Sequence, residues 1–419
     1  MVLETVQRAL KISDLRFRIL FTIAMFVVFR IGVHVPVPGV DTAEIQRLIG
    51  QGTLFSFLDV FSGGALALFS IFAMSITPYI NASIIVQLLT IVIPKFEEWS
   101  KEGSEGRKKL TQYTRYGTVL LAMIQAIGMT FAVRSAVINP GFLSFSIIVI
   151  TLTAGTAFLM WLGEQITEKG IGNGISLLIF AGIVSRLPSG LQRLIEFWQA
   201  GVINFFNIFA LVVIGAVVIA AVVWIQEGQR RIPVQYAKRV VGRRMYGGHS
   251  SHIPLKINQA GVIPVIFAVS VLAFPATIAQ FIQHPLAQKI TTLFQFRSTT
   301  YLVLEFLLIV FFAYFYTAVT FNPVDVANNV KKYGGFIPGM RPGKPTAVYL
   351  DRVLTRITLA GAIFLATVAI LPNFVMAATD IPSVYFGGTA LLIVVGVALE
   401  TMKQIESHLI MRHYQGFMK

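Results

Sequence analysis

The stretch TLFSFLDVFSGGALALFSIF, residues 53–72, is the most informative part of this chain for predicting its fold. It is mostly apolar, but Asp59 lies in its middle, and Gly63 with Gly64 would break a helix. A full-length apolar run, residues 71–93, follows at once and is long enough to cross a bilayer. The first stretch therefore predicts a segment that enters a membrane without spanning it.

The composition is that of a polytopic membrane protein. Of the 419 residues, 55% are hydrophobic and only 13% are charged. Crossing the hydrocarbon core takes about 20 apolar residues per helix, and no alternation of period two recurs that would predict a barrel. The predicted fold class is therefore an all-α polytopic membrane protein.

Ten apolar runs are candidate transmembrane helices. Five plus five spans would invert the second half relative to the first, an arrangement that places a pathway between the halves. We therefore expect an N-terminal half at residues 1–200 and a C-terminal half at residues 201–419. The ten runs are 17–35, 71–93, 116–133, 144–162, the short run 174–187, 203–225, 261–282, 301–321, 354–371 and 385–399.

The basic residues predict the orientation of these spans, because Lys and Arg gather on the cytoplasmic side. If the N-terminus is cytoplasmic, most of the 34 Lys and Arg residues lie in cytoplasmic segments, and so does the C-terminus. The net charge of +15 then needs no nucleic-acid partner, although basic loops also favour anionic lipids or an acidic or RNA-containing partner. On the other side lie only Arg47, Arg134, Arg186, Arg193, Lys289 and Arg297, with Arg30 inside span 1.

Two long, basic loops, 226–257 and 322–353, would both be cytoplasmic, and loops above about 15 residues usually have a function. In the first, the β-prone arms 231–241 and 249–257 flank the tip GRRMYGG, a pattern that predicts a protruding hairpin. The second contains KKYGGFIPGMRPGKPT, whose Gly and Pro residues predict a rigid, irregular platform. We expect the two loops to be paired docking arms.

The sequence contains few motifs that would indicate ion coupling, catalysis or metal binding. The span interiors show no central ionisable residue of the kind that ion-coupled transporters use. No protease, hydrolase or nucleotide-loop pattern occurs, so neither an enzyme nor a cofactor is predicted. His249 and His252 lack a nearby third ligand, and the chain has no cysteine, so no metal site is predicted.

Isoleucines at a spacing of four point to one face in two spans, Ile76 with Ile80 and Ile175 with Ile179. Such pairs are more often ordinary packing than the lining of a pore. The spacing alone therefore leaves both interpretations open.

Ten motifs, in order along nearly the whole chain, resemble the bacterial SecY family, the channel subunits of Sec translocons. They are FRIGVHVPVPGVD (29–41), FSGGAL (61–66), PYINASIIVQLLT (78–90), QYTRYGT (112–118), FLMWLGEQITEKGIGNGIS (158–176), GQRRIPVQYAKR (228–239), LKINQAGVIPVIFA (255–268), FNPVDVANN (321–329), PGMRPG (338–343) and FGGTALLIVV (386–395).

The resemblance implies two five-helix halves around an hourglass channel through which unfolded secretory proteins pass, and from which membrane helices leave sideways. It identifies the opening stretch, at about 53–65, as a re-entrant plug helix that folds back into the outer funnel, where Asp59 would be tolerable in water. The implied plug residues are Phe55, Phe57, Leu58, Asp59, Phe61, Gly63 and Gly64. The implied apolar constriction ring consists of Ile76, Ile80, Ile175, Ile179, Ile266 and Ile393.

The resemblance also implies a lateral gate between spans 2 and 7, with spans 3 and 8 alongside. We expect polar residues and bend-permitting prolines there: Asn81, Gln87, Gln125, Pro78 and Pro264. Docking of the motor SecA and of the ribosome would use Arg243, Arg244, Lys331, Arg341 and Lys344. SecE and SecG would be the membrane partners, and a secretory polypeptide with its signal sequence would be the cargo.

Two alternatives stay open beside a protein-conducting channel in the bacterial plasma membrane. A secondary transporter of small solutes would need a charge near the membrane centre. A structural or insertase subunit would have no aqueous pore.

Overall fold

The computed structural model describes residues 11–50, 59, 62–236, 239–241, 244–246, 250–281, 298–379 and 388–416. Helices dominate both halves of the chain. The first half contains α2 (Ser13–Val33), α3 (Thr42–Gly50), α5 (Thr77–Val92), α6 (Pro94–Lys101), α7 (Ser104–Ala132), the 3-10 turn η1 (Arg134–Ala136), α8 (Phe142–Lys169), α9 (Gly174–Ser185) and α10 (Leu187–Gln199).

In its described residues, the second half adds long helices and five short strands. The helices are α11 (Phe205–Glu227), α12 (Ile263–Phe281), α14 (Thr299–Thr320), α15 (Pro323–Lys332), α16 (Lys344–Thr379) and α17 (Gly388–Gly416). The strands are β1 (Gln229–Tyr236), β2 (Arg239–Val241), β3 (Arg244–Tyr246), β4 (Ser250–Lys256) and β5 (Gly335–Phe336).

Each of the ten predicted spans corresponds to a described helix or helix pair. By length and composition alone, six described helical segments could cross a membrane, or seven if α5 and α6, bent by 101° at their break, form one span. The remaining three predicted spans correspond to α2, α7 and α12. The short fifth run is α9, and α10, which has Pro188 in its first turn, extends it to a segment of 26 residues, Gly174–Gln199. The predicted all-α fold is confirmed.

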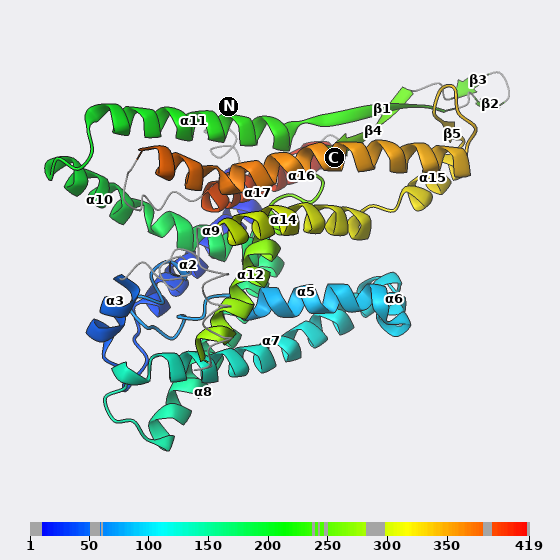
Figure 1. The fold of residues 1–419 in the computed structure, drawn as a ribbon. Coiled ribbons are helices and arrows are strands. Elements are labelled where there is room, and N and C mark those ends of the chain that lie inside the picture. Colours follow the sequence, from blue (N-terminus) through cyan, green and yellow to red (C-terminus); the bar gives the residue numbers. More distant parts are fainter. Residues whose placement is uncertain are drawn as a thin grey trace.

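The helix α12 lies between the two halves. It packs against α5 and α7 of the first half and against α14 and α17 of the second. Figure 1 shows α12 crossing between the α5, α7 and α8 group and the α11, α14 and α16 group. The seam between the halves therefore runs along α12.

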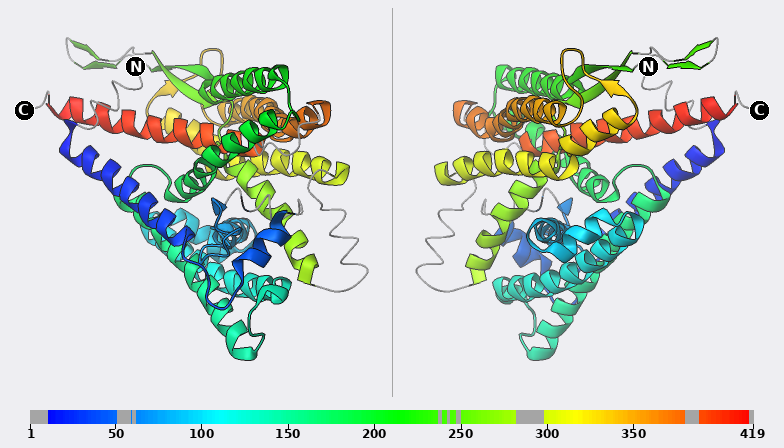
Figure 2. Two further views of the ribbon diagram at one scale, coloured as in Figure 1. Left: turned by 90° about the vertical axis from the view of Figure 1, so that its left-hand side faces the viewer. Right: turned by 90° about the vertical axis from the view of Figure 1, so that its right-hand side faces the viewer.

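The two ends of the molecule differ in architecture. Figure 1 shows α6, α15 and all the strands at one end and α3 with α10 at the opposite end. The start of α2 packs on α17 through Leu15, Ile19, Ile405 and Leu409, and Figure 2 shows these two helices meeting. The basic loops and α6 thus share one end, as the charge pattern predicts.

The two long loops form one small domain. Strands β1 and β4 pair antiparallel from Gln229 opposite Lys256 to Gln235 opposite Ser250, which confirms the predicted hairpin. The second loop contributes α15 and the strand β5, which pairs with β1, where an irregular platform was expected. A shared apolar core that includes Ile232, Leu255 and Leu350 lies beneath the sheet. The expected paired arms are therefore joined by hydrogen bonds and by packing.

Residues 63–69 and 71–76 form turns rather than a helix, and Ser70 between them makes an isolated β-bridge with Pro36. Positive φ angles at Gly63 and Gly64, 67° and 94°, reverse the chain as predicted. The segment then passes so close to α8 that a Cβ at Gly155 would overlap the carbonyl group of Ile71. It therefore packs as an inner layer against the first half.

Candidate functional site

A constriction lies on the seam between the halves. Residues of α5, α9, α12 and α17 surround a cavity of only about 30 Å³, room for about two water molecules. Five of the six predicted ring residues line it: Ile76, Ile80, Ile179, Ile266 and Ile393. Each of the five is at most 8% exposed, so the ring is closed by branched apolar side chains.

A wider polar cavity continues from the ring toward the strand-bearing end. Its volume is about 420 Å³, and it shares Ile80, Ile179 and Ile266 with the constriction. Ile175, the sixth predicted ring residue, lines this wider cavity and is absent from the lining of the constriction. The ring therefore contains five of the six expected isoleucines, without Ile175.

One ion pair lies in the wall of the wider cavity. The Arg115 guanidinium on α7 contacts the Glu164 carboxylate on α8 twice, through Nε to Oε1 and through Nη2 to Oε2, both at 2.8 Å. Glu168, one turn further along α8, also lines the cavity. The vestibule thus combines charged groups with the apolar side chains of the ring.

On the other side of the ring, Asp59 and Gly63 are fixed by arginines that the sequence did not single out. Asp59 is completely buried and forms an ion pair with Arg186 at the junction of α9 and α10. Arg30 of α2 donates to the Gly63 carbonyl at 2.9 Å. The expectation that Asp59 sits in water is wrong, because a cation within the protein compensates its charge. Four predicted plug residues, Phe55, Phe57, Leu58 and Phe61, lie outside the described residues.

The predicted gate residues lie on α5, α7 and α12, three helices that pack against one another where the two halves meet. Asn81 is buried with no hydrogen bond to its Nδ2, whereas the Gln87 Nε2 lies 3.5 Å from the Ser83 hydroxyl. Gln125 is half-buried on α7. Among the described hydrogen bonds, none joins two of these three amides.

The prediction that Pro78 and Pro264 interrupt the gate helices is wrong. Both lie in the first turn, of α5 and α12 respectively. A first-turn proline is tolerated because its position needs no backbone donor. The proline inside α12 is Pro275.

The predicted docking residues are distributed over the small domain. Lys331 in α15, Arg341 in the loop after β5 and Lys344 at the start of α16 are exposed. Arg244 begins β3, and Arg243 lies outside the described residues. A Cβ on Gly343, between Arg341 and Lys344, would lie 4.0 Å from the Lys331 Cδ, so these exposed basic residues are neighbours, and we refer to them as the basic surface.

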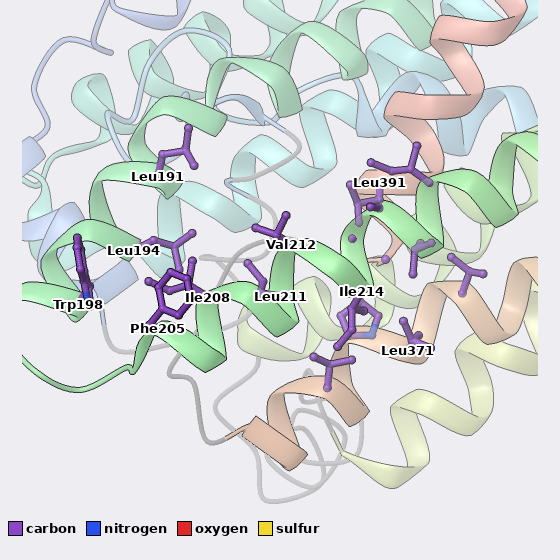
Figure 3. A pocket seen from close by; sticks show the side chains of 18 of the residues that line it. Leu191, Leu194, Trp198, Phe205, Ile208, Leu211, Val212, Ile214, Leu371 and Leu391 are labelled. Atoms are coloured by element: carbon purple, nitrogen blue, oxygen red, sulfur yellow. The ribbon is translucent and has the colours of Figure 1, made fainter.

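A further cavity shares no lining residue with the constriction or the vestibule. It measures about 770 Å³ and lies between α10, α11, α16 and α17, with almost entirely apolar walls (Figure 3). Its lining includes Leu194, Trp198, Ile208, Leu211 and Leu371. The helix α11 exposes many other apolar side chains beside it.

Comparison with known proteins gives consistent results. The family model described as SecY matches residues 70–402. The chain is 50% identical to the protein translocase subunit SecY of Halalkalibacterium halodurans, over 99% of this chain and 100% of that protein.

Three solved structures share the fold. "The structure of a protein conducting channel" has a TM-score of 0.67 at 19% identity, covering 94% of this chain and 92% of the other. A second describes the SecY plug domain stabilising the closed state of the translocation channel, with a TM-score of 0.66, 19% identity and the same coverage. The third, Sec61 in a canine ribosome-channel complex, has a TM-score of 0.63 at 18% identity, with coverage of 94% and 92%.

Proposed function

Because the chain belongs to the SecY family of protein translocase channel subunits, we propose that the ring of Ile76, Ile80, Ile179, Ile266 and Ile393 is the constriction through which an unfolded secretory polypeptide passes. One observation supports this most strongly: the ring lies at the seam of the two halves and opens directly into a polar vestibule. Branched apolar side chains dewet a narrow opening against ions and present no fixed charge to bind a passing chain.

The closed state would have two barriers in series. The ring forms one, and the segment that contains Asp59 and Gly63 forms the plug on the outer side of it. The halves 1–200 and 201–419 would part along α12, where α12 meets α5 and α7, to release apolar segments into the bilayer. The weakly bonded amides Asn81 and Gln87 suit a seam that opens and closes.

The chain would act as a passive pore with both termini cytoplasmic. SecA or the ribosome would supply the energy and dock on the basic surface of Lys331, Arg341 and Lys344. A SecE helix would cover part of the apolar membrane surface that α11 exposes, and SecG would be a further membrane partner. Anionic lipids would contact the cytoplasmic loops.

The test uses the absence of cysteine from the chain. Ile80→Cys is combined with a secretory chain that carries one cysteine and is arrested in transit, and disulfide adducts are scored after oxidation. We expect an adduct whose position on the substrate shifts with the arrest point. Ile179→Cys and Ile266→Cys should behave likewise, whereas Ile85→Cys, on the same helix as Ile80 but 47% exposed, should not react. If none of the three ring cysteines reacts with an engaged substrate, the polypeptide does not pass here.

A further inference from the structure

The segment before α5 is fastened to the rest of the protein by a buried carboxylate. Asp59 Oδ1 accepts a hydrogen bond from the Ala67 amide at 2.8 Å, and the Ser62 hydroxyl lies 3.4 Å from it. The carboxylate also forms an ion pair with Arg186. A buried carboxylate that lost its cation would be strongly disfavoured, because little water can reach it.

A second arginine holds the same segment by its backbone. Arg30 Nη1 donates to the Gly63 carbonyl at 2.9 Å and to the Ser185 hydroxyl at 3.0 Å. The Ser185 hydroxyl in turn donates to the Gly182 carbonyl at 2.7 Å. Arg30 therefore joins the segment to the end of α9.

Glycines allow the segment to approach this anchor closely. A Cβ on Gly63 would lie 2.9 Å from the Gly182 Cα, so the two backbones are in direct contact. A Cβ on Gly64 would lie 3.6 Å from Arg186 Nη1, so the guanidinium lies against the turn. The close approach therefore depends on the absence of a side chain at Gly63, whereas at Gly64 it is the φ of 94° that favours glycine.

All these partners belong to the first half. Among the described contacts of residues 59 and 62–64, every hydrogen bond or ion pair to a separate helix goes to Arg30 of α2 or to Arg186. Arg186 is both the C-cap of α9 and the N-cap of α10, the last helix before the chain enters the second half at α11. A change of angle at this junction would pull directly on Asp59.

We propose that Arg186, assisted by Arg30, is the positioning residue of the plug, and that it fastens the plug to the first half through the junction of α9 and α10. The proposal rests on the proposed function, in which this segment closes the outer side of the pore. The plug is then released when the ion pair between Asp59 and Arg186 breaks and water hydrates the Asp59 carboxylate. Until that exchange, it moves with α2 and α9 rather than with the second half.

The exposures of the two partners differ, and this difference makes the proposal testable. The Arg186 side chain is 32% exposed, whereas the Asp59 side chain is 1% exposed. Loss of Arg186 leaves a charge that only movement of the plug can hydrate, whereas loss of the Asp59 charge leaves an arginine that already reaches water. Arg186→Gln should therefore disturb the plug much more than Asp59→Asn, and the double variant should resemble Asp59→Asn.

The experiment measures labelling of Ser62→Cys by a membrane-impermeant maleimide in the assembled membrane complex, together with the ion conductance of that complex without substrate. Ser62 is 2% exposed, so the parent should label slowly. We expect Arg186→Gln to raise labelling and conductance by about tenfold or more. Labelling and conductance should be close to those of the Ser62→Cys parent in the double variant Asp59→Asn/Arg186→Gln, and also in Arg186→Lys. Arg47→Gln, on the exposed helix α3, is the control and should change neither.

Three outcomes are decisive. Unchanged labelling and conductance in Arg186→Gln would overturn the positioning role. Equal increases in Arg186→Gln and in the double variant would overturn the pairing with Asp59, because removing the buried charge should restore the plug. Labelling could rise in Arg186→Gln and fall again in the double variant while no variant conducts ions. That result would support the anchoring of the plug by Arg186 and contradict the channel function.

Discussion

Arg115 on α7 and Glu164 on α8 are joined by two contacts of 2.8 Å in the wall of the polar vestibule. Their exposures differ: the Arg115 side chain is 47% exposed and the Glu164 side chain only 14%. A bidentate contact between a guanidinium and a carboxylate fixes the orientation of the two side chains as well as the distance between them. The pair therefore fastens α7 to α8 beside the entry to the ring.

We expect Arg115→Ala to lower the stability of the purified complex by about 1 kcal/mol, because Glu164 loses its cation while solvent screens part of the interaction. Arg115→Ala/Glu164→Ala should be less destabilised than Arg115→Ala, since no carboxylate is then left unpaired. Thermal unfolding measures both. Arg47→Ala breaks the more exposed pair with Glu44 and should have almost no effect. A double variant that is less stable than Arg115→Ala would show that packing, rather than charge, dominates at this site.

The ring and the vestibule should respond differently to the same substitution. Ile179→Asn places an amide in the 30 Å³ constriction, whereas Ile175→Asn, one turn away on α9, places it in the 420 Å³ vestibule. We expect Ile179→Asn to increase ion leak several-fold while a polypeptide is in transit, because a polar ring dewets less readily. Ile175→Asn should leave the leak near the parent value. Conductance of complexes with an arrested substrate measures both, and equal leaks would place Ile175 in the seal.

The joined cytoplasmic loops depend on close packing that two substitutions should disrupt. A Cβ on Gly335 would lie 2.9 Å from the Tyr236 ring, so Gly335→Val should displace β5 from β1. Leu350→Ala removes a fully buried side chain beneath the sheet and should cost about 2–5 kcal/mol. Faster proteolysis within 226–257 and 322–353 would reveal both effects. Val348→Ala, 51% exposed on the same helix as Leu350, should not change the cleavage rate.

Long apolar runs and local alternation could be predicted from the sequence, because both depend on neighbouring residues. The ten spans and the β1 and β4 hairpin follow from such patterns. The strand β5 could not be predicted, because its two residues gain their partner only when Gln235 meets Phe336, about a hundred positions away. Pairing at this range leaves no local periodicity in the sequence.

The partners of the re-entrant segment were missed for the same reason. Asp59 was expected in a water-filled funnel because a carboxylate is costly against lipid, whereas its counter-ion, Arg186, follows another span. Arg186 and Arg30 were among the few basic residues outside the cytoplasmic segments. That exception to the charge pattern was the one available signal that these arginines have a specific role. The prolines were misplaced because the start of α5, at Thr77, lies well inside its apolar run.

The last prediction concerns the contact between α8 and the turns that precede α5, which we call the turn segment. The atoms that an added side chain on α8 would meet there belong to the backbone, which cannot rotate away as a side chain can. The Cβ of Gly155→Ala would overlap the carbonyl group of Ile71, whose amide is itself held by the Val35 carbonyl at 3.0 Å. Neither chain can yield without moving the start of α5, which carries the ring residues Ile76 and Ile80. We therefore expect Gly155→Ala to destabilise the protein by about 1–3 kcal/mol, as overpacking does.

Gly190→Ala is the matched control for Gly155→Ala, because Gly190 also lies within a helix but has no atom within 4 Å of an added Cβ. It should be neutral, or stabilising by up to about 1 kcal/mol, since alanine favours the helix. Thermal unfolding of the two variants, together with the yield of folded protein in the membrane, measures the difference. If Gly155→Ala were as stable as Gly190→Ala, the turn segment could not be a rigid inner layer, and the ring would lack the support that keeps Ile76 and Ile80 in register with α9 and α12.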